Sequence, residues 1–264
     1  MIRTRLSIAA VLLALLGQSS AENGPRIGII IDDLGYQLAA GRRAIALPGP
    51  VAYAVLPGTP FGRRLAALAE AEGKDVLLHL PLEAVDHEGP AEPGAIMLDM
   101  SRSAFKTQFA EAIAAVPNAI GVSSHRGSLL TRHPGHMAWL MEAIRDRDDL
   151  FFIDSYTTHE SVALRIAAEE GVAATRRDVF LDHRRSVEAI AAEFERLKKI
   201  ASKKGHAIAI GHPFPETLEV LERELPRLAE QGFELVTISV LMSDARNRKQ
   251  ASRSNSFEHL ILAQ

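Results

Sequence analysis

The sequence predicts an α/β fold, a barrel in which helices connect each parallel strand to the next. Short apolar runs alternate with amphipathic stretches from Pro25 onward, and this alternation is typical of parallel strands joined by helical crossovers. The apolar runs are continuous, which indicates a sheet that is buried on both faces. Seven or eight such units in about 240 residues favour a barrel over an open sheet.

The strands are expected at the apolar runs and the helices at the amphipathic stretches between them. Strands are expected at 27–31, 51–55, 76–80, 120–122, 151–153, 207–210 and 235–238, with weaker candidates at 172–174 and 179–181. Helices are expected at 61–72, 103–116, 136–145, 160–170, 187–203 and 216–231. Because no linker or internal repeat interrupts this order, residues 22–245 are expected to form one domain.

Both ends of the chain are expected to lie outside this domain. Residues 1–5 contain two arginines, residues 6–16 are almost entirely apolar, and small residues stand at 19–21. This is typical of a signal peptide cleaved near Ala21, because the apolar run is too short for a bilayer of about 30 Å. The mature chain is then expected in the periplasm or outside the cell, without stable membrane insertion; an uncleaved anchor is the alternative. The polar residues 246–264 are expected to form a tail.

Composition excludes several classes of function. The 264 residues include 30 Lys and Arg against 33 Asp and Glu, a net charge of −3. The chain therefore lacks the basic excess of a nucleic-acid-binding protein. Cysteine is absent, which excludes disulfides, thiolate metal sites and cysteine nucleophiles. Any metal ion must be bound by histidine and carboxylate side chains.

Acidic residues and histidines stand at the carboxyl ends of five expected strands. They are Asp32 and Asp33 after 27–31, His79 in 76–80, His125 after 120–122, Asp154 after 151–153, and His212 after 207–210. In a parallel barrel these ends converge on one face, where active sites are built. Two adjacent carboxylates after a buried strand are costly without a counter-charge, which a divalent metal ion would provide.

Each of these residues also has a structural interpretation. A histidine at a strand end is often a hydrogen-bonded structural group, and Asp32 and Asp33 could cap a helix that begins near Gln37. Asp154 could likewise cap the segment that follows its strand. The coincidence of five strand ends favours a shared site over five separate structural roles.

Five segments resemble, in order and spacing, the motifs of the divergent polysaccharide deacetylases. They are 30–35 (IIDDLG), 79–83 (HLPLE), 121–128 (GVSSHRGS), 152–155 (FIDS) and 210–213 (IGHP). The resemblance covers roughly residues 25–242. It implies the fold of the NodB-like carbohydrate esterases, an irregular (β/α) barrel of about seven parallel strands. It also implies metal-dependent removal of N-acetyl, or O-acetyl, groups from an envelope or extracellular glycan.

The resemblance implies a role for each residue that matches a family motif. Asp32 resembles the general base of the group, and Asp33 resembles its aspartate metal ligand. His79 stands where the histidine ligand motif begins, and His125 is expected to supply the further histidine ligand. His212 resembles the general acid.

Two departures from the family pattern lie close to this expected metal site. Glu83 stands where the group has its second histidine, and Ser123 and Ser124 replace two asparagines that usually precede the histidine of the third motif. Glu83 is expected on a loop over the barrel mouth, with Ser128 and Asp154 as further substrate-binding residues. The arginine and aromatic substrate motifs of active deacetylases are not evident.

The residue set suits hydrolysis of an acetyl amide. One aspartate and two neutral imidazoles leave open positions on Zn²⁺, and equally on Co²⁺ or Fe²⁺. The ion would lower the pKa of a bound water and polarise the acetyl oxygen. Asp32 would take the proton of that water, and His212 would protonate the leaving nitrogen. An acetylated glycan is the expected substrate.

Two other functions remain open. A catalytically silent periplasmic glycan-binding or regulatory protein could keep the barrel and a relic metal site, which would explain the replaced second histidine. A different metal-dependent hydrolase, such as a phosphoesterase, could use a similar barrel. No glycine-rich phosphate loop follows a strand, however, and the turn at 56–60 contains two prolines, which lack the N–H donors that bind phosphate.

Overall fold

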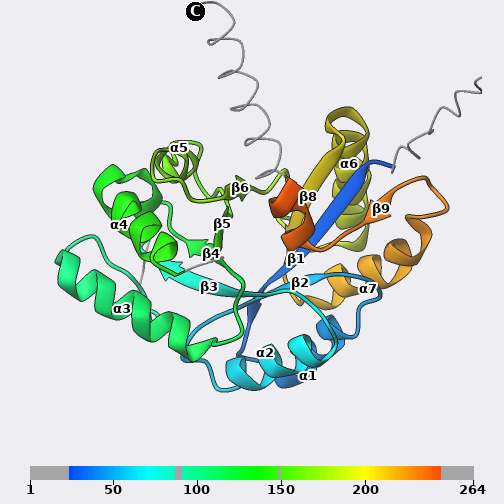
Figure 1. The fold of residues 1–264 in the computed structure, drawn as a ribbon. Coiled ribbons are helices and arrows are strands. Elements are labelled where there is room, and N and C mark those ends of the chain that lie inside the picture. Colours follow the sequence, from blue (N-terminus) through cyan, green and yellow to red (C-terminus); the bar gives the residue numbers. More distant parts are fainter. Residues whose placement is uncertain (1–23, 87–90, 148–149, 245–264) are drawn as a thin grey trace, which may run out of the picture.

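Parallel strands alternate with helices along the whole chain from residue 24 to residue 244 (Figure 1). The computed structural model describes residues 24–86, 91–147 and 150–244. The strands are β1 (Arg26–Leu34), β2 (Ala52–Val55), β3 (Val76–Leu82), β4 (Gly121–Arg126), β5 (Phe151–Asp154), β6 (Ala174–Arg176), β7 (Val179–Phe180), β8 (His206–Gly211) and β9 (Glu234–Leu235). The helices are α1 (Leu38–Ile45), α2 (Gly62–Ala71), α3 (Arg102–Ala115), α4 (Pro134–Arg145), α5 (Ala163–Glu169), α6 (Val187–Lys204) and α7 (Pro215–Glu224).

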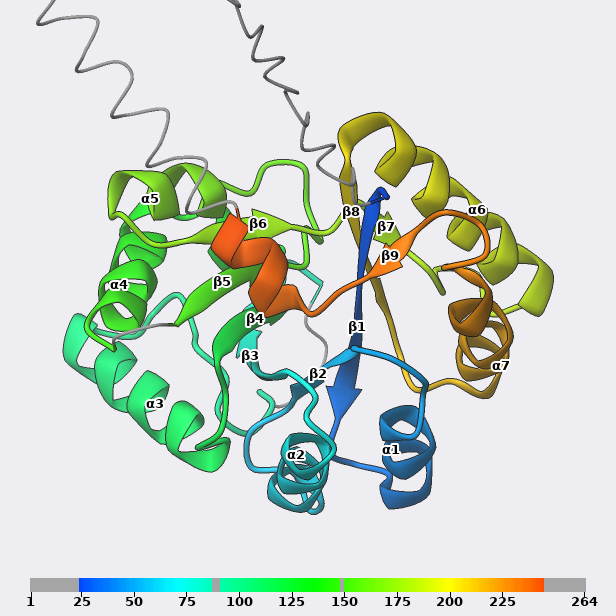
Figure 2. The ribbon, with the colours of Figure 1, turned by 45° about the vertical axis from the view of Figure 1, so that its right-hand side comes forward.

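The strands form one curled sheet with the helices on its outer face (Figures 1 and 2). Its order is β6-β5-β4-β3-β2-β1-β8-β7, with β9 also pairing with β1, and every pairing is parallel. The two strands at the ends of this order, β6 and β7, are separated in the chain only by residues 177–178. The segment 174–180 thus pairs with β5 along its first part and with β8 along its last part. The predicted barrel of parallel strands is confirmed.

Side chains alternate between two hydrophobic clusters along the strands. In β1, Ile27, Ile29 and Ile31 pack against the outer helices, whereas Ile30 lies in a smaller cluster inside the curled sheet. This alternation follows from the two-residue period of a β-strand. The next residue on the inner side of β1 is Asp32, so the inner face changes from apolar to acidic toward the carboxyl end of the strand.

A short helix at 238–244 packs inside the curled sheet near the amino end of β1 (Figures 1 and 2). Ile238 and Leu241 belong to the inner cluster, and a Cβ on Gly28 would lie 2.7 Å and 2.8 Å from their Cδ1 atoms. The backbone N–H of Ser239 donates to Asp75 Oδ2 at 2.8 Å. The apolar packing therefore occupies the amino end of the barrel, and the polar strand ends lie at the other.

Three secondary-structure elements differ from the sequence-based expectation. Helix α1 is not among the helices expected from periodicity and entered only as the helix near Gln37 that Asp32 and Asp33 could cap; its N-cap is Gln37 itself. The helix expected at 216–231 ends at Glu224, since Pro226 cannot continue it and a 3₁₀ turn follows. The strand expected at 235–238 is wrong beyond Leu235, because Ile238 starts the short helix described above.

The terminal predictions concern residues that the structure does not describe. The signal peptide expected at 1–21 and the tail expected at 246–264 both lie outside the described ranges. Within those ranges, no helix combines the length and the apolar character that crossing a membrane requires.

Candidate metal and catalytic site

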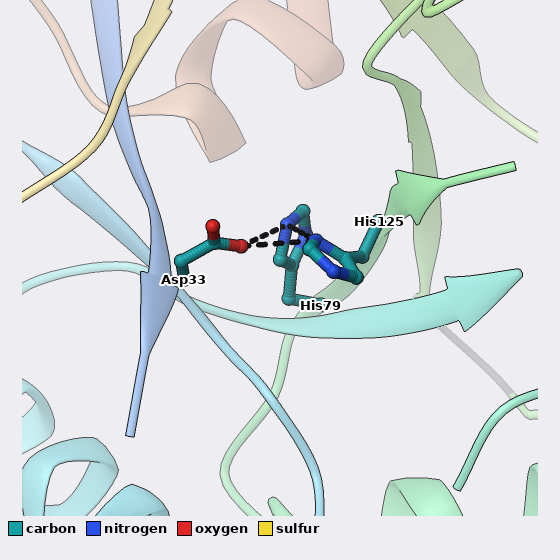
Figure 3. A group of neighbouring side chains, drawn as sticks. All are labelled: Asp33, His79 and His125. Carbon is teal, nitrogen blue, oxygen red and sulfur yellow. Dashed lines mark hydrogen bonds and ion pairs between the residues drawn. The ribbon is translucent and has the colours of Figure 1, made fainter. Parts of the chain in front are cut away.

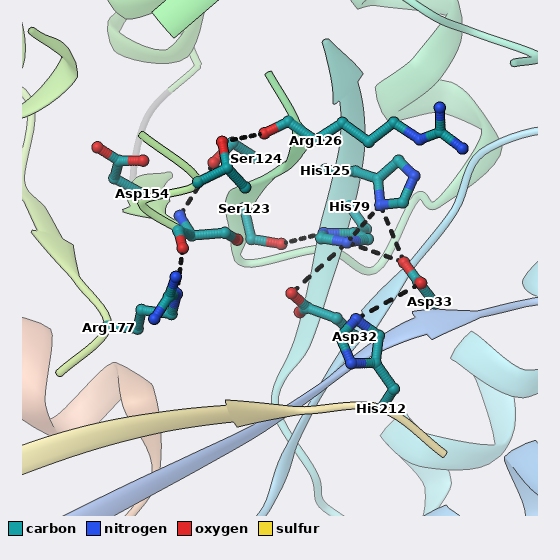
Figure 4. A network of polar contacts seen from close by, with 12 residues as sticks. Asp32, Asp33, His79, Ser123, Ser124, His125, Arg126, Asp154, Arg177 and His212 are labelled. Carbon is teal, nitrogen blue, oxygen red and sulfur yellow. Dashed lines mark hydrogen bonds and ion pairs between the residues drawn. The ribbon is translucent and has the colours of Figure 1, made fainter. Parts of the chain in front are cut away.

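Four strands bring five polar side chains to one point at the carboxyl end of the barrel (Figure 4). They are Asp32 and Asp33 on β1, His79 on β3, His125 on β4, and His212 directly after β8. Asp32, His79 and His212 each stand two residues after an inward-facing Ile or Leu, so the alternation of the strand turns them inward as well.

The backbone of β1 turns both adjacent aspartates toward this point. Neighbouring residues of a regular strand face opposite ways, but the register with β2 shifts between Ile31 and Leu34, and Asp33 has a φ of 60°. Asp and Asn tolerate this left-handed conformation better than most side chains. Both aspartates thus belong to the strand, and the N-cap of α1 is Gln37.

Three ligand atoms from Asp33, His79 and His125 form a small triangle (Figure 3). Asp33 Oδ1 lies 3.2 Å from His79 Nε2 and 2.9 Å from His125 Nδ1, and the two ring nitrogens are 3.1 Å apart. Neighbouring ligands on an ion with bonds of about 2.0–2.2 Å are separated by about 2.8–3.6 Å, from octahedral to tetrahedral angles. Among the described residues, these three are the one group of His and acidic side chains close enough to hold a metal ion. The geometry therefore fits a shared ion.

The lack of a hydrogen-bond partner among the described residues for one oxygen of Asp33 also fits a metal ligand. Its Oδ1 atom is buried and has no well-directed hydrogen bond in the described part of the chain, despite its closeness to two imidazoles. Burial raises the pKa of Asp33, but contacts with His125 and His79 outweigh burial and hold that pKa far below its usual range. The carboxylate is therefore ionised.

The pKa of His125 rises to about 9, because its contacts with Asp33 and Glu92 outweigh burial. A metal ion must therefore displace a proton from His125 when it binds.

Two side chains hold the imidazoles with their ligand atoms turned toward Asp33. Ser123 Oγ lies 2.7 Å from His79 Nδ1, and Glu92 Oε2 lies 3.0 Å from His125 Nε2. Metal-binding histidines typically use their second ring nitrogen in this way, which fixes the ring and its tautomer. Glu92 was not predicted from the sequence, because it lies on the long connection between β3 and α3, away from any strand end.

His212 is held by a separate carboxylate. Its Nδ1 lies 2.9 Å from Asp182 Oδ1, while Asp182 Oδ2 accepts hydrogen bonds from the backbone N–H of His212 at 2.6 Å and from Thr217 Oγ1 at 2.8 Å. Burial lowers the pKa of His212, but the bond to Asp182 outweighs burial and the pKa is raised overall. The other nitrogen, Nε2, faces Asp33 Oδ2 at 3.5 Å. Asp182 was not predicted as a site residue. It directly follows the weaker expected strand at 179–181, so a search for acidic residues at the end of that strand would have identified it.

Asp32 differs from its neighbour in its electrostatic surroundings. Burial raises its pKa, and the nearby His79 and His212 offset this only in part. Its Oδ1 is buried without a hydrogen-bond partner among the described residues, and its Oδ2 lies 3.5 Å from His79 Nε2. Two adjacent carboxyl groups whose pKa values shift in opposite directions are typical of sites with separate acid–base and charge-stabilising roles.

Two of the expected substrate-binding residues lie on loops next to His125. Glu83 follows β3 and its Oε2 accepts a hydrogen bond from the backbone N–H of Leu98 at 2.6 Å. Ser128 follows β4 and its Oγ accepts a hydrogen bond from the backbone N–H of Val85 at 3.0 Å. Both side chains therefore hold loop backbone in place, and neither is part of the triangle of ligand atoms.

Asp154 lies apart from the other strand-end residues. It stands two residues after Phe152, which packs against the outer helices, so the alternation of β5 turns it away from the barrel interior. Its carboxylate accepts hydrogen bonds from Tyr156 N at 2.8 Å and from Ser161 Oγ at 2.7 Å. These bonds order the loop after β5, but Asp154 does not cap a helix, because the N-cap of α5 is Val162.

Comparison with known sequences identifies relatives over most of the chain. The profile of the divergent polysaccharide deacetylases matches residues 29–242. An uncharacterized protein of Haemophilus influenzae is 37% identical over 205 residues, which are 78% of this chain and 72% of the relative. The Escherichia coli protein YibQ is 34% identical over 231 residues, which are 88% of this chain and 72% of the relative.

Several solved structures share the fold of this chain. The Agrobacterium tumefaciens protein ATU2773 superposes with a TM-score of 0.80 at 24% identity, covering 84% of this chain and 91% of that one. A mutant of the peptidoglycan deacetylase PdaC of Bacillus subtilis superposes with a TM-score of 0.53 at 13% identity, covering 88% of this chain and 98% of that one. BA3943 of Bacillus anthracis, a CE4 family pseudoenzyme, superposes with a TM-score of 0.51 at 16% identity, covering 84% and 66%. With its family profile spanning β1 to the last helix and its fold matching these structures, the chain belongs to the divergent polysaccharide deacetylases.

Proposed function

We propose that the protein is a metal-dependent hydrolase that removes N-acetyl or O-acetyl groups from an envelope or extracellular glycan. One observation carries the proposal. Three ligand atoms of Asp33, His79 and His125 lie 2.9–3.2 Å from one another, and Asp32 and His212 adjoin them with raised pKa values. Membership of the family supports the same reaction, and the signal-like residues 1–21 support action outside the cytoplasm.

Asp33, His79 and His125 would hold the ion, which Zn²⁺, Co²⁺ or Fe²⁺ would suit. When bound, such an ion activates a water molecule and polarises the acetyl oxygen. Asp33 contributes the one negative charge of the ligand set, and its low pKa keeps that charge at neutral pH. Ser123 and Glu92 keep the two imidazoles oriented for this purpose.

Asp32 and His212 would transfer the protons. The raised pKa of Asp32 makes its carboxylate a stronger base, and its buried Oδ1 is free to accept a proton from water. The raised pKa of His212 keeps a proton available for the leaving nitrogen or oxygen, and Asp182 orients the ring through Nδ1. Neither residue is needed as a ligand.

The three expected substrate-binding residues would act mainly through their loops. Glu83 and Ser128 belong to two loops that are bonded to each other, since Leu129 N and Leu130 N both donate to Glu83 O. We assign these loops, together with the loop that Asp154 orders, to the wall of the glycan groove.

A catalytically silent glycan-binding protein is the second candidate. The replacement of the second motif histidine by Glu83 favours it, as does the likeness in fold to the pseudoenzyme BA3943. The retention of a histidine at 125, within 2.9 Å of Asp33, favours the hydrolase.

Metal content and acetate release test the proposed function together. The purified protein is expected to retain about one Zn²⁺, Co²⁺ or Fe²⁺ per chain and to release acetate from chitooligosaccharides, peptidoglycan or acetylated xylan. A chelator should abolish the release, and added metal should restore it. A metal-loaded protein that releases no acetate from any of these glycans would support the silent candidate. A protein that binds none of the three ions would overturn the metal site itself.

Glu92 provides a prediction about metal affinity alone. Glu92→Ala is expected to weaken metal binding by about 10–100-fold, because His125 loses the partner that fixes its ring. Glu92→Gln should recover part of this loss, since the amide oxygen keeps a close polar contact with His125 Nε2 but lacks the charge. Competition against a metal-binding dye measures both variants, with Glu70→Gln on the exposed face of α2 as the control. Unchanged affinity in Glu92→Ala would show that His125 does not need this partner.

A further inference from the structure

Two pairs of adjacent arginines flank β7 next to His212. Arg176 and Arg177 precede the strand, and Arg184 and Arg185 follow it. None of these four guanidinium groups has a carboxylate within ion-pair distance in the described part of the chain. The two acids in the same ten residues, Asp178 and Asp182, pair instead with Lys204 and His212.

Aromatic rings connect two of these arginines to His212. The ring of Phe180 lies 5.4 Å from the His212 ring, and the ring of Phe214 lies 5.3 Å from it. The guanidinium of Arg177 lies 4.8 Å from the centre of the Phe180 ring, and that of Arg185 lies 3.5 Å from the centre of the Phe214 ring. Stacking of this kind holds a guanidinium in place, and the edge of Arg177 is in part bound to the carbonyl oxygens of Ser155 and Tyr156. The general acid proposed above thus lies between two stacked cations.

A pocket of about 300 Å³ opens on the Phe180 side of this arrangement. Its walls include Arg177, Phe180, His183, Arg184, Glu193 and Arg196. Glu193 is already paired with Arg196 at 2.7 Å, so Arg177 and Arg184 supply two positive charges that no carboxylate in the wall offsets. Arg177 is fixed by hydrogen bonds to the carbonyl oxygens of Ser155 and Tyr156. Asp154 and Asp32, outside the wall, offset part of the Arg177 charge, so the net positive charge of the pocket rests mainly on Arg184.

We propose that this pocket binds an anionic group, a carboxylate or a phosphate, on the glycan whose acetyl group reaches the metal site. The planar fork of an arginine matches both anions with paired hydrogen bonds, and a neutral sugar would leave these donors without a charged partner. The volume is at the lower end of the range for ligand pockets and suits one substituted sugar ring. The proposal rests on the hydrolase function proposed above and names the class of its substrate as an acidic acetylated glycan.

The test compares three tetrasaccharides that differ in charge. They are neutral chitotetraose, chitotetraose 6-phosphate, and a tetrasaccharide of alternating N-acetylglucosamine and glucuronic acid. Calorimetric titration of the full-length protein, with and without added Zn²⁺, should show about tenfold or tighter binding of at least one acidic probe over the neutral one. The preferred probe identifies the anion as carboxylate or phosphate.

Single substitutions separate the pocket from a general charge effect. Arg184→Gln should reduce the preference for the acidic probe to about twofold or less, and Arg184→Lys should keep part of it. Arg64→Gln on the exposed face of α2 removes the same charge far from the pocket and should leave the preference unchanged. Equal binding of all three probes, no binding of the acidic probes, or a preference that survives in Arg184→Gln would overturn the proposal.

The measurement distinguishes failure of the pocket from failure of the hydrolase. Binding is measured without turnover, so an anion preference that depends on Arg184 stands even if no glycan releases acetate. Acetate release from neutral and acidic glycans at the same kcat/KM would instead leave the hydrolase intact and overturn the pocket alone.

Discussion

Asp33→Asn is expected to abolish metal binding and acetate release together. Asp33 Oδ1 is the only negatively charged atom in the triangle with His79 Nε2 and His125 Nδ1, and an amide cannot replace that charge. Loss of one ligand of three should weaken Zn²⁺ binding by about a thousandfold or more, given the total free energy of such sites. Turnover should fall to the level of the chelator-treated wild type. Metal analysis after dialysis and competition against a chelating dye measure the first effect.

Asparagine is the appropriate replacement at this position for a structural reason. The φ of Asp33 is 60°, and an alanine would add the cost of a left-handed backbone to the loss of the ligand, whereas Asn adopts this conformation readily. Asp99→Asn, on an exposed part of the loop before α3, serves as the control for charge removal. An Asp33→Asn protein that folds and still binds Zn²⁺ with wild-type affinity would remove Asp33 from the ligand set.

His212→Ala is expected to lower turnover by about 10²–10⁴-fold while leaving metal affinity nearly unchanged. His212 Nδ1 is occupied by Asp182, and Nε2 faces Asp33 Oδ2, the oxygen outside the ligand triangle. The histidine can therefore transfer a proton without holding the ion. Steady-state kinetics on any substrate that the wild type hydrolyses gives kcat, and dye competition gives the metal affinity of the same preparation.

A histidine at the other end of the same strand provides the matched control. His206 begins β8, beside Arg26 at the amino end of β1, so His206→Ala should change neither quantity. Loss of the metal from His212→Ala would make His212 a ligand. Full activity in that variant would exclude it as the general acid.

Most of the site could be predicted because β-strands obey simple geometric rules. Parallel strands end on the same side of a sheet, so Asp32, His79, His125 and His212 could be assigned to one face without any coordinates. The same rules explain why Asp154 lies elsewhere. Because side chains alternate along a strand, Asp154 faces the outer helices as Phe152 does. The expectation for Asp154 considered only the end of the strand and not this alternation.

The remaining site residues could not be predicted, because their positions depend on loops and on close contacts. Glu92 reaches His125 from a connection with no periodic pattern. The left-handed conformation of Asp33, which brings two adjacent aspartates to one side, accompanies a register shift that the sequence does not reveal. The arginines around β7 are visible as two dipeptides, but their stacking on Phe180 and Phe214 is a tertiary feature.

The place of β1 in the middle of the sheet determines when the site can form during folding. Arg26 pairs both with His206 of β8 and with Glu234 of β9, which are synthesised long after it. Closing such long loops costs chain entropy and slows folding, whereas β2 to β5 each find a neighbour close by in the chain. Strand β1, which comes first among the described strands, is therefore among the last to gain all its partners. The site gains His212, which directly follows β8, only after residues 206–211 have joined the sheet.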